Sequence, residues 1–78
     1  MLKIQNLRGD GIKLYMDVLI EGDATNSFEL CVDQNNTMYP VLSSSIPEEY
    51  RLYERQARMA LRKYIGSELP ETIVSSWY

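Results

Sequence analysis

The chain has no histidine and only one cysteine, Cys31, among its 78 residues. It therefore lacks the commonest metal ligand in proteins and the usual general base at neutral pH. One cysteine cannot form an internal disulfide, and without histidine a cysteine–histidine nucleophile is impossible. The sequence also has no glycine-rich phosphate loop and no dinucleotide-binding motif. These absences predict a protein that is not an enzyme and uses neither a metal nor a cofactor.

Long apolar runs are missing as well. No segment approaches the roughly 20 apolar residues that a membrane-spanning helix needs. The first residues lack the apolar core and the small-residue cleavage site of a secretory signal. We therefore expect a cytoplasmic protein with no membrane partner, and its small size points to a bacterial or bacteriophage origin.

The composition of the chain is that of a folded domain, with 45% apolar and 24% charged residues. We expect one domain over residues 1–78, with a core that supplies only about 3 to 5 kcal/mol at this length. The formal net charge is -3, yet five of the eight lysines and arginines fall between residues 51 and 63. Positive charge is therefore concentrated in one segment of an acidic chain.

That segment belongs to the best helical pattern in the sequence, which runs from residue 45 to residue 66. Its apolar residues recur at helical spacing on a stripe about 100° wide, the pattern of a helix that packs on a core. The stripe consists of Ile46, Tyr50, Tyr53, Ala57, Ala60, Leu61 and Tyr64. The sequence therefore predicts one long amphipathic helix near the C-terminus.

Both ends of this helix carry recognisable signals. Ser45 with Glu48 three residues later fits a capping box, whereas Pro47 at the first helical position would make Ile46 the N-cap instead. Gly66 follows two basic residues and can adopt the positive φ that often ends a helix. The predicted start is therefore residue 45 or 46, and the predicted end is Gly66.

Apolar and polar residues alternate in three earlier segments, residues 2–7, 12–21 and 27–33, which predicts three β-strands. Residues 37–43 form a predicted fourth strand, and Pro40 places it at the edge of the sheet or gives it a bulge. Residues 69–78 have helical spacing after Pro70, although Thr72, Ile73 and Val74 are typical of a strand. We predict an α+β fold: a four-stranded antiparallel meander, one long helix packed on one face, and a short terminal helix or tail.

The feature with functional potential is a row of arginines, Arg51, Arg55, Arg58 and Arg62, on one side of the predicted helix. Such a row can be a solvated face, in part paired with acids such as Glu54 four residues before Arg58. It can also contact an acidic protein surface or the successive phosphates of a nucleic acid. The net acidity of the chain favours the protein partner over the nucleic acid.

Two apolar pairs lie outside the predicted core. Tyr15 and Leu19 fall on the outer face of the second strand, and Leu52 and Met59 lie seven residues apart on a flank of the helix. A short chain with apolar surface on two sides is expected to self-associate, most simply as a two-fold homodimer. The alternative is that the tail folds back and Trp77 covers one of these patches.

The sequence therefore favours a small non-catalytic protein-interaction module, a regulator or inhibitor that acts by binding the surface of another protein. The predicted binding residues are the four arginines together with Tyr15, Leu19, Leu52 and Met59. The alternative is a small nucleic-acid-binding regulator that uses Arg51, Arg55, Arg58 and Arg62. No small-molecule substrate is indicated.

Overall fold

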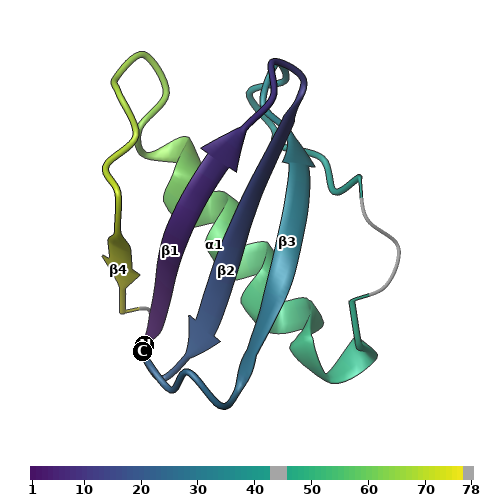
Figure 1. Ribbon diagram of the computed structural model, residues 1–78, viewed down its shortest axis with the longest axis vertical. Coiled ribbons are helices and arrows are strands. Elements are labelled where there is room, and N and C mark those ends of the chain that lie inside the picture. Colours follow the sequence, from purple (N-terminus) through teal and green to yellow (C-terminus); the bar gives the residue numbers. More distant parts are fainter. Residues whose placement is uncertain (43–45, 77–78) are drawn as a thin grey trace.

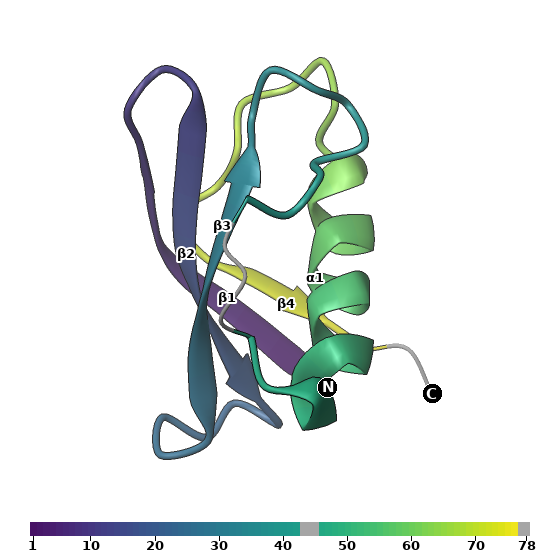
Figure 2. The same ribbon diagram turned by 90° about the vertical axis from the view of Figure 1, so that its right-hand side faces the viewer.

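The computed structural model describes residues 1–42 and 46–76. Its elements are β1 (Leu2–Gly9), β2 (Lys13–Ile20), β3 (Ser27–Asp33), the 3₁₀ turn η1 (Glu48–Tyr50), α1 (Arg51–Arg62) and β4 (Ile73–Ser75). The helix lies along one face of a four-stranded antiparallel sheet, so the protein has two layers (Figures 1 and 2). This confirms the predicted α+β class. No helix in the described ranges is long and apolar enough to cross a membrane.

The first three strands follow the predicted alternation closely. β3 has the predicted bounds, β1 extends two residues further, and β2 is one residue shorter at each end. β2 lies between β1 and β3, and Val18 stands opposite Ile4 on one side and Phe28 on the other. All three of these side chains are buried, because this face of the sheet packs against the helix.

The fourth strand is not the predicted one. The sheet order is β3-β2-β1-β4, and β4 pairs antiparallel with β1, with Ile73 opposite Ile4. The predicted strand over 37–43 is wrong, because its described part forms only an isolated bridge between Val41 and Val32. The predicted terminal helix is also wrong, and the β-branched residues Ile73 and Val74 form a strand instead. The chain therefore returns beside its first strand after the helix, in the strand order of a Greek key.

β1 is interrupted by a bulge where its register with β2 shifts between Gln5 and Arg8. Asn6 adopts a positive φ of 56° at this point, a conformation that asparagine tolerates better than most residues. Its side-chain amide donates a hydrogen bond to Asp17 over 2.7 Å, and the Arg8 guanidinium donates to the Asn6 carbonyl. The bulge is therefore held by specific side chains.

The helix begins later than the sequence predicts. Pro47 precedes η1 with extended backbone and makes no side-chain cap bond, so Ile46 is not the N-cap. The alternative cap, Ser45, lies outside the described residues. Proline fits just before the first turn because it has no N–H to satisfy there. At the other end α1 stops at Arg62, four residues before the predicted end, so the helix is shorter than predicted. Tight turns continue to Gly66, which has the predicted positive φ, +83°.

The inner face of α1 is the predicted apolar stripe. Ala57, Ala60 and Leu61 are buried, and the two alanines let the helix backbone approach the sheet. Tyr50 stacks on Phe28 of β3, with ring centroids 5.2 Å apart. These contacts fix which face of the helix remains in water.

The loop between β2 and β3 is organised by Asp23. Thr25 donates to the Asp23 carboxylate from its hydroxyl over 2.7 Å and from its backbone N–H over 2.9 Å. These two bonds, the hydroxyl bond first, hold the pKa of the Asp23 carboxyl below its ordinary value. The hydroxyl of Tyr50 also donates to Asn26, which ties the loop to the start of the helix.

Candidate functional site

The outer side of α1 carries basic and apolar side chains together. Leu52 and Met59 are 53% and 50% exposed, although large apolar residues of a helix usually face the core. We call this surface the helix face. It consists of the exposed residues Arg51, Leu52, Arg55, Met59, Arg62 and Lys63.

Three of the predicted arginines are available for binding. Within residues 1–42 and 46–76, no hydrogen bond or ion pair engages the side chain of Arg51, Arg55 or Arg62. The same holds for Lys63, which extends the positive charge toward the end of the helix. Each guanidinium therefore keeps its donors free for an acidic group.

Arg58 is different, because it is used inside the chain. Its Nε donates to the Tyr39 carbonyl over 2.9 Å, and a second nitrogen donates to the Met38 carbonyl over 3.2 Å. A third contact, over 3.1 Å, is the predicted ion pair with Glu54, whose side chain is only 14% exposed. Arg58 therefore attaches the turn that contains residues 38 and 39 to the helix, and it is not a free member of the arginine row.

Two shallow depressions adjoin the helix face. The first, of about 310 Å³, lies among Met38, Arg55, Arg58, Met59 and Arg62. The second, of about 360 Å³, lies among Met59, Arg62, Lys63 and Ile65. They share Met59 and Arg62, so they form one continuous surface of apolar side chains surrounded by cations. Met38 and Ile65 come from turns, and the helical spacing of the sequence could not reveal them.

The outer face of the sheet offers less apolar surface than predicted. Leu19 is only 5% exposed and stands between Lys3 and Ser27 on the neighbouring strands. The Arg8 guanidinium lies 5.9 Å from the ring centroid of half-buried Tyr15.

Arg8 also forms ion pairs with Glu29 over 2.6 Å and with Asp17 over 3.6 Å. This face therefore carries a charged network of its own. Trp77, the predicted alternative cover for an apolar patch, lies outside the described residues.

In the part of the chain that the structure describes, no group of three or more Cys, Asp or Glu side chains is placed to hold a metal ion. Comparison of the chain with protein-family models, curated proteins and solved structures finds no significant match. The helix face is therefore interpreted from its geometry and charge.

Proposed function

We propose that this protein is a non-catalytic interaction module that binds an acidic surface of another protein through the helix face. The observation that carries the proposal is the set of unpaired arginines around exposed Leu52 and Met59. Arginine and methionine are enriched in protein interfaces. The cations would guide the encounter and select an acidic partner, and the apolar side chains would supply buried area.

A purely solvated face accounts for the arginines but not for the apolar side chains between them. Met59 lines both depressions, and methionine adapts its shape to a partner at little cost. In this proposal the protein is a cytoplasmic regulator or inhibitor of bacterial or bacteriophage origin. It acts by occupying the surface of its target.

Nucleic acid is the second candidate. Arg51 and Arg62 are about 16 Å apart along the helix at a rise of 1.5 Å per residue, a distance that can reach successive phosphates. Two features speak against it. The chain carries a net charge of -3, and exposed Leu52 and Met59 have no favourable contact with a phosphate backbone.

Changing Arg55 and Arg62 together to glutamine should abolish capture of the partner and leave the fold intact. Both side chains are exposed and unpaired, and exposed charges contribute only about 0 to 1 kcal/mol each to stability. Affinity capture from a bacterial extract, followed by identification of the retained protein, measures the effect. Arg58 is left unchanged because it has a structural role.

The matched control changes Lys3 and Lys13 on the sheet to glutamine, which alters the net charge by the same amount. Capture by this control should equal that of the wild type. If both variants capture the partner equally well, the arginines do not take part in binding and only face solvent. A band shift with random-sequence DNA that the Arg55→Gln/Arg62→Gln variant loses would favour the nucleic-acid candidate.

The predicted homodimer would use the same face, because Leu52 and Met59 are exposed there whereas Leu19 is buried. Two copies would bring like-charged arginines together, and salt screens this repulsion. We therefore expect dimerisation to strengthen as salt is raised from about 50 mM to about 500 mM, whereas binding to an acidic partner weakens. Sedimentation equilibrium at the two salt concentrations measures the dimer. A dimer that weakens with salt would place its interface away from the helix face.

A further inference from the structure

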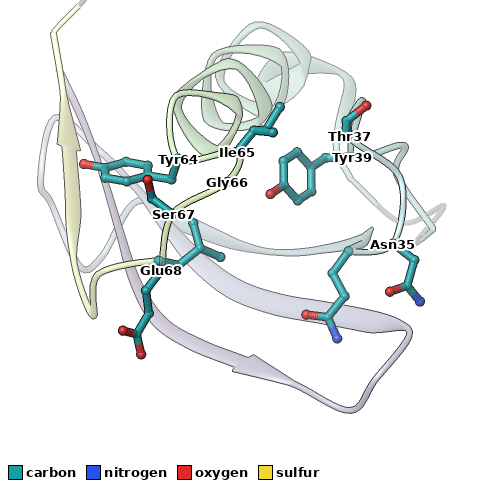
Figure 3. A pocket seen from close by; sticks show the side chains of 10 residues that line it. Asn35, Thr37, Tyr39, Tyr64, Ile65, Gly66, Ser67 and Glu68 are labelled. Atoms are coloured by element: carbon teal, nitrogen blue, oxygen red, sulfur yellow. The ribbon is translucent and has the colours of Figure 1, made fainter.

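A separate pocket of about 480 Å³, open to solvent, lies beyond the C-terminal end of α1, between the turn over residues 34–39 and the segment over residues 64–69. We call it the cavity. Figure 3 shows the ring of Tyr39 entering it from one side and Tyr64 standing on the other. Gln34, Ile65, Ser67 and Leu69 also line it. The cavity is of the size that small-molecule sites usually have.

The hydroxyl of Tyr39 has no partner among the described residues. The Tyr39 side chain is buried, with a residue exposure of 9%, and the hydrogen bonds of this residue all involve its backbone. Figure 3 shows the hydroxyl directed into the open space of the cavity. Buried polar groups are almost always satisfied by a protein group, a water molecule or a ligand. The cavity therefore presents one unpaired hydroxyl, which can donate or accept a hydrogen bond, to a molecule that enters it.

The backbone of Tyr39 is held in an unfavourable conformation that gives the ring this position. Its φ is +49°, in the left-handed region that bulky residues rarely adopt. Two contacts hold it there: the Tyr39 N–H donates to the Asn36 carbonyl over 2.8 Å, and Arg58 donates to the Tyr39 carbonyl. Conformations of this kind often occur at binding sites, where the surrounding structure maintains them for a function.

The walls of the cavity indicate what it can hold. Ile65, Leu69 and the tyrosine rings are apolar, and Gln34 and Ser67 add uncharged polar groups. No lysine or arginine occurs among its described lining residues, and the carboxylate that lines it, Glu68, points away from the interior in Figure 3. An anion would find no counter-charge here. An uncharged aromatic group fits, because it can pack on the apolar walls and hydrogen-bond to the Tyr39 hydroxyl.

We propose that this cavity binds a small uncharged aromatic molecule that carries one hydrogen-bonding group, in the class of phenols and indoles. The inference rests on Tyr39 and its cavity, and it does not depend on the helix face. The same chemistry is found in a tyrosine or tryptophan side chain of a partner protein, so the test separates a free molecule from such a side chain.

The test is a titration of the ¹⁵N-labelled protein with phenol and, separately, with benzene. Phenol should shift the amide signals of residues 34–39 and 64–69 and leave those of β1 and β2 unchanged. Tyr39→Phe keeps the ring but removes the hydroxyl, so it should weaken phenol binding by about three- to tenfold and leave benzene binding unchanged. Tyr15→Phe, the same change on the far face of the sheet, should bind both molecules like the wild type.

Several outcomes would overturn the inference. Phenol shifts that are scattered over the surface, or a phenol affinity that Tyr39→Phe does not reduce, would remove the hydroxyl from any binding role. A protein partner whose capture is lost in Tyr39→Phe, without any phenol shift in the wild type, would assign the cavity to a partner side chain instead. A thermal melt checks the fold of the variant, which loses no hydrogen bond of the described structure.

Discussion

Replacing Arg58 with alanine is expected to lower the free energy of unfolding by about 2 to 3 kcal/mol, more than any other change on the outer side of α1. The variant loses the hydrogen bonds to the carbonyls of Met38 and Tyr39, and it leaves the carboxylate of Glu54 without its cation. Hydrogen bonds to charged groups contribute more than neutral ones, and a partly buried charge left alone is costly. Urea unfolding followed by circular dichroism measures the loss.

Arg55→Ala is the matched control, since Arg55 lies three residues earlier on the same helix and is exposed. It should change the free energy of unfolding by less than about 0.5 kcal/mol. Arg58→Lys keeps the charge, but all of its donors lie on one nitrogen, whereas the guanidinium makes these contacts from three. Its loss should therefore be intermediate. Equal effects of Arg58→Ala and Arg55→Ala would show that the turn does not depend on the guanidinium.

Ile73→Ala is the second large expected effect, a loss of about 3 kcal/mol. Ile73 is 4% exposed and packs in the core as part of β4, opposite Ile4 of β1. The alanine removes three carbons from a packed site, and the cavity that remains adds to the lost transfer energy. For a domain of this length the midpoint of thermal unfolding should fall by roughly 10 °C or more.

The control for this change is the next residue of the same strand. Val74 is 60% exposed on the opposite side, so Val74→Ala should move the midpoint by only roughly 2 to 4 °C. Neighbouring side chains of a strand point to opposite faces of the sheet. A large effect at residue 73 and a small one at residue 74 are therefore expected if β4 is formed. Two small effects would mean that the tail contributes little to the core and that β4 is not formed in solution.

The sequence is sufficient to predict those helices and strands in which buried residues recur at a regular spacing. Strict alternation predicts β2 because Leu14, Met16 and Val18, at every second position, meet the core. Helical spacing predicts α1 because one stripe of the helix meets the same core. The fourth strand could not be found in this way. β4 has three residues, too few for a period, and it is fixed by pairing with β1 at the opposite end of the chain.

The segment from Thr37 to Leu42 shows the opposite error. Its residues resemble a strand in composition, but Tyr39 adopts a left-handed conformation, which no residue of a regular strand can have. A carbonyl-to-guanidinium contact with Arg58 holds that turn. Such a contact depends on which carbonyl happens to face the helix, and the side-chain pattern of the sequence contains no information about that.

The candidate site likewise has features that a sequence pattern predicts and features that depend on contacts between distant segments. Arginine spacing correctly predicts an exposed basic face, because that spacing depends only on the geometry of one helix. It cannot separate Arg58 from Arg55, since the difference arises from a turn that is distant in the sequence. For the same reason, the sequence could not show that Met38 and Ile65 line the depressions beside the helix face. It also could not show where the Tyr39 hydroxyl lies.

The bulge in β1 also bears on how the edge of this sheet can meet a strand of another molecule. β4 pairs with β1 only from Leu2 to Ile4, so within the described residues the later part of that edge has no strand paired with it. A regular open edge is a template for aggregation. The left-handed Asn6 interrupts the regular spacing of backbone donors and acceptors there, so an incoming strand cannot form an unbroken ladder. We therefore expect Asn6 to oppose edge-to-edge pairing between copies of the chain.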